Sequence, residues 1–183
     1  SDLFAFDGKT GSDMAISDSA SSLAGPSAAY RNPVYGQYFA DPFVLQAEGA
    51  YFAFGTGKGT EEAFAFQVLR SADLTTWTAL GSALLVPPEL AGRDFWAPEV
   101  VPHEGVFHMY YSAGIGDVGH HIRLAVSSQP SGPYVDQGPV QGIESPFAID
   151  AHVYGHTDSE RYLYFAADRL EGERPGTCLY VDR

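Results

Sequence analysis

The sequence predicts an all-β fold made of a repeated unit of short strands. One phrase occurs three times in related form, as Ala40-Asp41-Pro42-Phe43-Val44, Trp96-Ala97-Pro98-Glu99-Val100 and Ile149-Asp150-Ala151-His152-Val153. An aromatic run typical of a strand follows each copy, and the second residues of the copies lie 56 and 53 positions apart. The 12 Phe and 11 Tyr occur without any sustained helical period of apolar residues. A unit of about four short strands, repeated at slightly more than about 40–50 residues, is typical of the blades of a β-propeller.

The length of the chain allows only part of a β-propeller. With 183 residues, the chain holds two complete repeats and the beginning of a third. We therefore predict a partial propeller of about two and a half to three four-stranded blades. Residues 1–38, rich in Ser, Ala, Gly and Asp, are expected to form an N-terminal extension. The incomplete propeller is expected at 39–183, with blades at about 41–85, 94–140 and 149–183.

The first blade is predicted from four apolar runs separated by turn residues. Its strands are expected at 41–46, 50–56, 65–71 and 76–84, with Glu48-Gly49 as a hairpin turn. In the segment between the last two strands, the carboxylate of Asp73 can accept hydrogen bonds from neighbouring backbone amides, and Trp77 is expected to pack beneath the turn. We interpret Asp73 as a structural turn residue, similar to the Asp-box turns of many propellers.

The second and third blades repeat this pattern of strands and turns. After the repeated phrase, strands are expected at 107–111 and 122–127 in the second blade, and at 161–168 and 177–183 in the third. Cys178 lies in the apolar run of the last strand, so we expect a buried and unreactive thiol. Because it is the single cysteine of the chain, an intrachain disulfide is excluded.

The charge of the chain limits its partners. The formal net charge is −13, and the 10 Lys and Arg residues are scattered along the sequence. Nucleic acid is therefore not expected as a partner, because phosphate binding relies on clustered basic residues. No apolar run is long enough to span a bilayer and no signal peptide is recognisable, so no membrane partner is expected, while a secreted and a cytoplasmic location both stay open.

The repeated phrase carries the residues with the clearest chemical potential. In a propeller the first strand of each blade lines the central channel, so Asp41, Ala97 and Asp150 are expected at equivalent places around one axis. The carboxylates of Asp41 and Asp150 would then both face the central channel. Hydrolysis of a glycosidic bond by inversion needs such a pair, one ionised to activate water and one protonated to assist the leaving oxygen, about 6.5–9.5 Å apart. A cap of a turn is the structural alternative for Asp41, and the recurrence at Asp150 disfavours it.

The three motifs resemble those of glycoside hydrolase family 43. The resemblance rests on Ala40-Asp41-Pro42-Phe43-Val44, on Asp94-Phe95-Trp96-Ala97-Pro98-Glu99-Val100 and on Ile149-Asp150-Ala151-His152-Val153-Tyr154, which occur in this order. It runs from about Asn32 to Arg183. Members of this family are five-bladed β-propellers that trim arabinose and xylose from plant polysaccharides, so the resemblance implies an arabinofuranosidase, xylosidase or arabinanase activity on arabinan, xylan or arabinoxylan.

The resemblance also implies roles for the two carboxylates. Asp41 would be the general base that activates water, and Asp150 would tune the pKa of the acid and orient the sugar. The family's general acid is a Glu that would follow in a later strand, and neither Glu171 nor Glu173 matches its motif. We therefore expect glycosidase activity from a complete enzyme and weak or no activity from this chain alone.

Four further residues are candidates for contact with substrate. Trp96 offers a flat face for stacking on a sugar ring, and Phe43 is a candidate pocket wall, although core packing is the alternative for both. Glu99 lies on the same side of its strand as Ala97, and a structural hydrogen-bonding role competes with a substrate contact. His152 is expected as a polar group of the channel, two residues beyond Asp150.

No cofactor and no metal site are predicted. His120 and His121 follow a glycine-rich loop, and His152 and His156 do not share a helical face, so no closed zinc ligand set is recognisable. Two alternatives to an enzyme stay open: a non-catalytic sugar-binding domain, and a partial propeller that assembles. In the second case, two copies would complete the propeller as a homo-oligomer.

Overall fold

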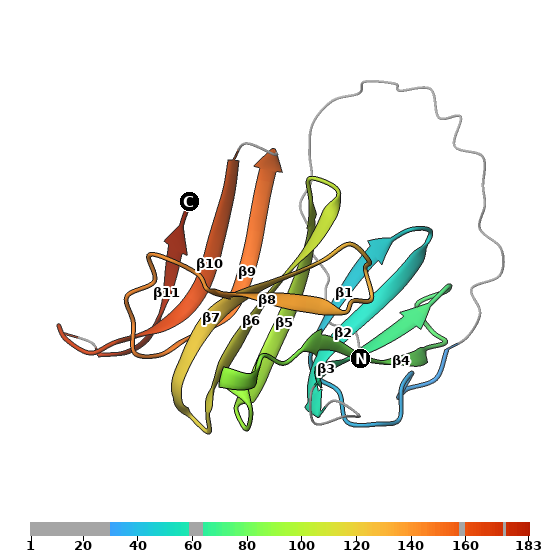
Figure 1. The fold of residues 1–183 in the computed structure, drawn as a ribbon, viewed down its shortest axis with the longest axis horizontal. Helices are drawn as coiled ribbons and strands as arrows, with labels where there is room; N and C mark the ends of the chain where they lie inside the picture. The colour runs from blue at the N-terminus through green and yellow to red at the C-terminus, as the bar shows by residue number, and fades with distance from the viewer. Residues whose placement is uncertain (1–29, 59–63, 158–159, 174) are drawn as a thin grey trace, which may run out of the picture.

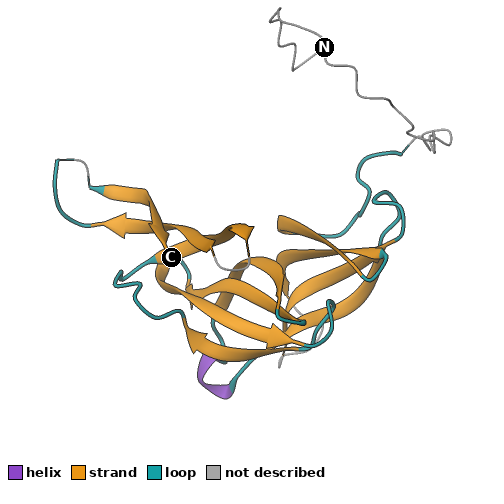
Figure 2. Ribbon diagram, turned by 90° about the horizontal axis from the view of Figure 1, so that it is seen from above, coloured by secondary structure: helices purple, strands orange, loops and turns teal. Residues whose placement is uncertain are grey.

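The computed structural model describes residues 30–58, 64–157, 160–173 and 175–183. Within these ranges the regular structure consists of eleven strands and one short 3-10 turn, η1 (Pro88–Leu90). Figure 2 shows strands throughout the described part, with η1 at one edge. Positions 1–29 of the extension expected at 1–38 lie outside the described residues. The all-β fold predicted from the sequence is confirmed.

Eight strands form one sheet that consists of two four-stranded blades. Its strands are β1 (Ala40–Ala47), β2 (Ala50–Lys58), β3 (Phe64–Ser71), β4 (Thr78–Leu85), β5 (Asp94–His103), β6 (Val106–Ile115), β7 (Val118–Ser127) and β8 (Tyr134–Pro139). Antiparallel neighbours follow the chain within each group of four, and the parallel pair β4 and β8 joins the two outer edges through Leu84 and Leu85. The two blades therefore share one continuous hydrogen-bonded sheet.

A second sheet of three antiparallel strands follows in the order β11-β10-β9. These strands are β9 (Ala148–Thr157), β10 (Glu160–Arg169) and β11 (Gly176–Asp182). In Figure 1 the three groups of strands stand side by side, from the cyan β1 to β3, through the green and yellow β5 to β7, to the orange and red β9 to β11. This arrangement is that of consecutive blades of a propeller.

Local sequence explains how the hairpins form. Glu48 and Gly49, the predicted turn between β1 and β2, both have positive φ, 50° and 72°. Two positive φ angles are the signature of the type I′ turn, whose twist matches that of paired strands. At the turn between β3 and β4, Asp73 Oδ1 accepts hydrogen bonds from the N–H groups of Thr76 and Thr75, and these bonds hold the pKa of Asp73 well below its usual range. The structural interpretation of this aspartate is confirmed.

The interface between the first two blades is aromatic. Phe54 of β2 meets Tyr134 of β8 edge to face, with ring centroids 6.1 Å apart. Phe66 of β3 makes the same kind of contact with Phe95 of β5 at 6.1 Å and with Tyr111 of β6 at 5.6 Å. Edge-to-face pairs contribute about 0.5–1.5 kcal/mol each beyond the burial of their area. This packing fixes the first blade against the second.

The interface between the second and third blades is built from smaller residues. Ile122 of β7 packs against a cluster from β9 and β10 whose buried members are Ala148, Ala151, Phe165 and Ala167. Both faces of β6 are therefore covered, because Tyr111 belongs to the first core while Tyr110 packs against the second. A strand with two covered faces is what a propeller requires of a blade that lies between neighbours.

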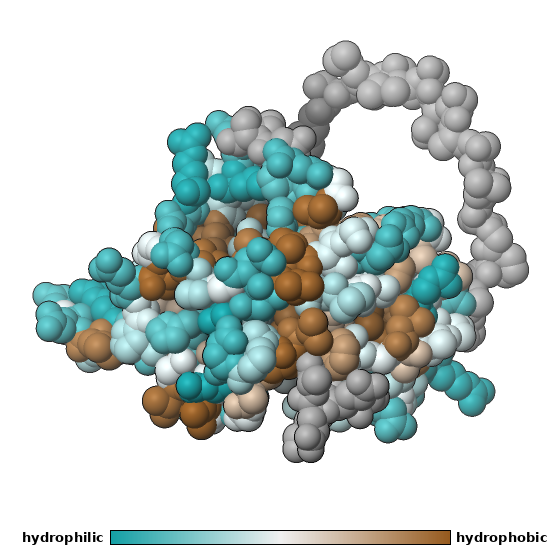
Figure 3. All heavy atoms as spheres, in the orientation of Figure 1, coloured by the Kyte–Doolittle hydropathy of each residue, from teal (hydrophilic) through white to brown (hydrophobic). Residues whose placement is uncertain are grey.

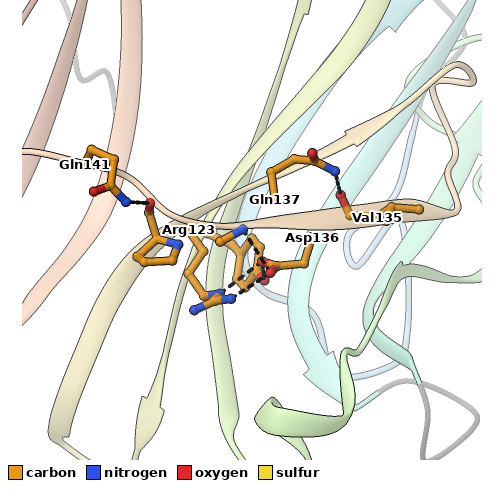
Figure 4. Close-up of polar contacts among 8 residues, drawn as sticks. Arg123, Val135, Asp136, Gln137 and Gln141 are labelled. Atoms are coloured by element: carbon orange, nitrogen blue, oxygen red, sulfur yellow. Dashed lines mark hydrogen bonds and ion pairs between the residues drawn. The ribbon is translucent and has the colours of Figure 1, made fainter.

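A buried ion pair stabilises the outer part of the second blade (Figure 4). Arg123 of β7 donates from Nη2 to Oδ2 of Asp136 in β8 at 2.6 Å, and from Nε to Oδ1 at 3.0 Å. The Tyr111 hydroxyl donates to the same Oδ1. The side chains of Arg123 and Asp136 are only 13% and 6% exposed. Burial alone would raise the pKa of Asp136, but the hydrogen bonds from Arg123 and Tyr111 outweigh it, so this pKa is lowered.

The last strand is more exposed than the sequence suggested. Leu179 and Val181 of β11 are solvent-exposed, and Cys178 is only partly buried, so the expectation of a buried thiol was wrong. The reason is that β11 pairs with β10 alone and no described strand lies on its other side. On the face drawn in Figure 3, apolar side chains form several separate groups among hydrophilic ones.

We predict that Asp136→Ala lowers the free energy of unfolding by about 3 kcal/mol at neutral pH, because it leaves the guanidinium of Arg123 buried without its carboxylate. Urea denaturation of the purified chain measures the loss. Gln137→Ala, which alters the exposed neighbour on the same strand, is the control and should cost less than about 0.5 kcal/mol.

The loss in free energy of unfolding caused by Asp136→Ala should also depend on pH. Because the pKa of Asp136 is lowered on folding, its contribution is present above the unfolded-state pKa of about 3.9 and is lost as the pH falls through the folded-state value. The difference between wild type and Asp136→Ala should therefore shrink in acid. A constant difference from neutral pH down to about pH 2 would contradict this account.

Candidate active site

The repeated phrase forms the same backbone irregularity in three strands. In β1, Asp41 and Pro42 face the single residue Gly55 of β2, because the pairing passes from Ala40–Thr56 to Phe43–Phe54. Equivalent bulges place Ala97 and Pro98 opposite one residue of β6, and Asp150 and Ala151 opposite one residue of β10. Such bulges bend a strand and re-aim a side chain, and they are common beside active sites.

The second residue of each phrase has a left-handed backbone. The φ angles are 49° at Asp41, 45° at Ala97 and 57° at Asp150. For residues other than glycine this conformation costs about 1–2 kcal/mol, and aspartate tolerates it better than most. The surrounding sheet must hold all three residues in this strained state, which is the kind of strain that clusters at functional sites.

The three bulged strands are neighbours in space. β1 and β2 pack against β5, and β5 packs against β9. A hydrogen bond from the backbone N–H of Ala97 to Thr56 Oγ1, 2.8 Å long, joins the bulge of β5 to β2 of the first blade. The three positions that the sequence predicted as equivalent thus lie on adjacent inner strands.

The two carboxylates are close enough to affect one another. Partial burial, and then the negative charge of Asp41, raise the pKa of Asp150 above its usual range. Like charges disfavour ionisation of a neighbouring acid only over short distances in partly desolvated surroundings. The charge of Asp41 thus acts on Asp150, while β5, which packs against both β1 and β9, carries a methyl group, Ala97, at the equivalent position.

Trp96 directly precedes Ala97 in β5, and its indole stacks on a buried histidine. The indole stacks on the imidazole of His120, with centroids 3.7 Å apart and planes inclined by 22°. His120 is fully buried, its Nε2 lies 2.8 Å from the carbonyl oxygen of Gly116, and burial lowers its pKa. Gly114 leaves room for the ring, since a Cβ there would lie 2.6 Å from His120 Cγ and 2.8 Å from its backbone nitrogen. Trp96 is partly buried, with one ring face occupied.

The other predicted residues separate into two groups. Phe43 packs against the main hydrophobic core, so the structure places it with the core side chains. Glu99 of β5 accepts hydrogen bonds from two groups of β9, namely Nδ1 of His152 and the backbone N–H of Val153, both at 2.8 Å. These two contacts join the second and third blades immediately beyond the bulge of Asp150.

Sequence reasoning missed three contributions to this region. The stack of His120 on Trp96, the pairing of Glu99 with His152, and the cap that Asp94 Oδ2 provides for the N–H of Gly116 all join residues distant in the chain. No local signal marks them, because each depends on how neighbouring strands align. The partnership of Glu99 was one of the alternatives that strand alternation left open.

The described residues contain no group of three or more His, Cys, Asp or Glu side chains arranged to hold a metal ion. Nor does any helix within the described ranges have the length and apolar character needed to cross a bilayer.

Comparison with known proteins identifies the family. A model described as glycosyl hydrolases family 43 matches residues 30–181. The chain belongs to glycosyl hydrolase family 43. A probable arabinan endo-1,5-α-L-arabinosidase A from Neosartorya fischeri is 36% identical over 126 residues, which cover 62% of this chain and 37% of that protein. An extracellular endo-α-(1→5)-L-arabinanase 1 from Bacillus subtilis is 31% identical over 140 residues, covering 69% and 42%.

Solved structures agree with the fold. The crystal structure of a thermostable family-43 glycoside hydrolase matches with a TM-score of 0.68 and 34% identity, over 84% of this chain and 50% of that chain. The described strands are thus part of a family 43 propeller. The chain spans about two fifths to one half of the length of these relatives.

We predict that Asp41→Asn lowers the pKa of Asp150, because it removes the neighbouring negative charge that raises it. Carbon-13 NMR titration of the Asp150 carboxyl group measures the change. The matched control is Glu48→Gln, which removes one charge from the turn just beyond the far end of β1, roughly 20 Å away at about 3.3 Å per residue. An Asp150 pKa that responds equally to both variants, or to neither, would contradict a direct effect of the Asp41 charge on Asp150.

We also predict that Gly114→Ala destabilises the fold by about 1–3 kcal/mol and disturbs the Trp96 environment, because the new methyl group meets the buried ring of His120. Urea denaturation and near-ultraviolet circular dichroism report the two effects. Gly57→Ala in β2 is the control, because a Cβ there would lie 4.0 Å from its nearest neighbours. Equal stability of the two variants would show that the stack tolerates movement.

Proposed function

We propose that this chain forms the base-bearing part of an inverting glycoside hydrolase that cleaves arabinofuranosyl or xylosyl linkages of plant polysaccharides. The observation that carries the proposal is that Asp41 and Asp150 lie at strained bulges of β1 and β9, two strands that both pack against β5, and that the charge of Asp41 raises the pKa of Asp150. Membership of family 43 supports the reaction class.

The proposed roles follow from the environments of the two carboxylates. Asp41 is solvent-exposed at its bulge, where it can accept a proton from a water molecule as that water attacks the anomeric carbon. Asp150, whose pKa is raised, is the second acidic group that orients the sugar and acts on the pKa of the general acid. We propose that this acid is supplied by a part of the propeller that the chain does not span.

The proposed substrates follow from the relatives and from the chemistry of the site. Relatives named arabinanases and xylosidase/arabinosidases support a pentose-containing polysaccharide. The acidic row formed by Asp41 and Asp150 and the net charge of −13 favour a neutral ligand over an anionic one. The partly exposed indole of Trp96 adds an apolar surface of the kind on which sugar rings stack.

The test uses the protein expressed from its complete coding sequence. We predict that Asp41→Asn lowers kcat on aryl α-L-arabinofuranoside, aryl β-D-xyloside or linear 1,5-arabinan by about 10²- to 10⁴-fold, the usual contribution of a general base. Proton NMR of the first-formed product should show inverted anomeric configuration. Glu48→Gln serves as the control and should leave turnover unchanged.

Each outcome decides between the candidate functions. Unchanged turnover in Asp41→Asn would remove that residue from the role of base, and a retained configuration would overturn the inverting mechanism. Sugar binding by calorimetry without any turnover would favour a non-catalytic sugar-binding domain. A folded preparation whose mass by light scattering is that of a dimer, with neither binding nor turnover, would favour an assembling partial propeller.

A further inference from the structure

A buried carboxylate of the second blade, that of Glu99, makes two hydrogen bonds to the third blade. Glu99 lies in β5, two residues beyond Ala97, and both of its oxygens are used on β9. Oε1 accepts the backbone N–H of Val153 and Oε2 lies 2.8 Å from Nδ1 of His152. Burying a carboxylate is costly unless its oxygens find donors, so this arrangement satisfies Glu99 and fixes two neighbouring groups at once.

The contact with Glu99 determines where the imidazole of His152 carries its hydrogen. A carboxylate has only acceptors, so Nδ1 must be the donor at 2.8 Å. In the neutral ring the other nitrogen, Nε2, is then a bare acceptor. Free imidazole has no such constraint, and a histidine whose Nδ1 binds a carboxylate is held in one tautomer and one orientation.

The two side chains differ in their access to solvent. The side chain of Glu99 is 12% exposed, whereas that of His152 is 60% exposed. Since Nδ1 contacts the buried carboxylate, we expect the exposed part of the ring to include its far edge, which carries Nε2. His152 lies two positions after Asp150 on β9, the strand whose bulge carries Asp150.

A purely structural role in joining the two blades explains only one of the two hydrogen bonds of Glu99. The bond from the Val153 N–H would by itself join β9 to β5, and an amide oxygen would accept it as well as a carboxylate. The second oxygen is directed at an exposed imidazole, whose ordering costs side-chain entropy and adds little to a blade interface already packed by Ile122 and Ala151. An ordered imidazole with a bare nitrogen is of use to a ligand.

We propose that Glu99 is a positioning residue that locks His152 in the Nδ1–H tautomer, so that Nε2 accepts a hydrogen bond from a hydroxyl group of a neutral sugar bound beside Asp150. The inference rests on the proposed function for its ligand class, but the tautomer lock stands on the contacts of Glu99 alone. An anionic ligand is disfavoured, because the carboxylate of Glu99 contacts His152 and Asp150 lies two residues before His152 on the same strand.

The first test reads the tautomer directly. In protein labelled with ¹⁵N-histidine, long-range ¹H–¹⁵N correlation spectra at alkaline pH distinguish the Nδ1–H from the Nε2–H ring, and His152 is assigned by its loss in His152→Asn. We expect the Nδ1–H form in wild type and a shift towards Nε2–H in Glu99→Gln, whose amide oxygen keeps the Val153 bond. A predominantly Nε2–H ring in wild type would overturn the lock.

The second test separates the Nε2 contact from the blade contact. In His152→Asn the amide NH₂ replaces Nδ1–H as donor to Glu99, and nothing replaces Nε2. We expect unchanged thermal stability and about tenfold weaker binding of 1,5-α-L-arabinotriose or xylotriose by calorimetry, the usual effect of one lost hydrogen bond. Glu99→Gln should weaken binding less. Glu48→Gln is the control and should bind as wild type does.

The outcomes distinguish this inference from the proposed function. If wild type binds a trisaccharide and His152→Asn binds it equally well, the role of Nε2 is wrong while the glycosidase proposal stands. If wild type binds neither sugar under conditions where the chain is folded, the proposed ligand class fails and the sugar contact fails with it. The NMR result then decides the tautomer lock on its own.

Discussion

The candidate site depends on a backbone constraint that three inner strands share. At the second residue of each repeated phrase the strand bulges and the backbone is left-handed, a conformation with an intrinsic cost for any residue other than glycine. Ala97 has the same backbone as Asp41 and Asp150 but no carboxylate, so the bulge is a property of the blade and not of the acid. The repeat supplies the geometry, and the residue type at that position decides whether it carries chemistry.

The two blade interfaces are built from different interactions, and this difference matters for the site. Large rings such as Phe54, Phe66 and Tyr111 hold the first blade to the second through edge-to-face contacts. Between the second and third blades a smaller apolar cluster, which includes three alanines, is joined by two directional hydrogen bonds to Glu99. Directional contacts define position more narrowly than apolar area does. The strand that carries Asp150 is therefore placed where a polar tie fixes its register.

Much of the fold could be predicted because its signals are local or repeated. The spacing of Asp41, Ala97 and Asp150 indicated the blades, and the Glu48-Gly49 and Asp73 turns follow from the chemistry of single residues. The parallel pairing of β4 with β8, the burial of Arg123 with Asp136, and the stack of His120 on Trp96 could not be predicted. Each joins strands whose relative register no short segment encodes. The exposure of Cys178 was missed for a related reason, because an apolar run indicates a strand but not whether another strand covers it.

The charges of the folded chain divide into those that stabilise it and those that oppose it. Asp136 has a lowered pKa, so its ionised form favours the folded state at neutral pH. Asp150 has a raised pKa, so its contribution is complete only below the unfolded-state value and is lost as the pH rises through the folded-state value. The fold therefore disfavours the ionised form of Asp150, through partial burial and the negative charge of Asp41. This unfavourable contribution to stability agrees with the proposed role of Asp150 as an acid that acts on other groups. The raised pKa of Asp150, together with the strained φ at the same residue, is the physical basis for proposing a chemical role for Asp41 and Asp150.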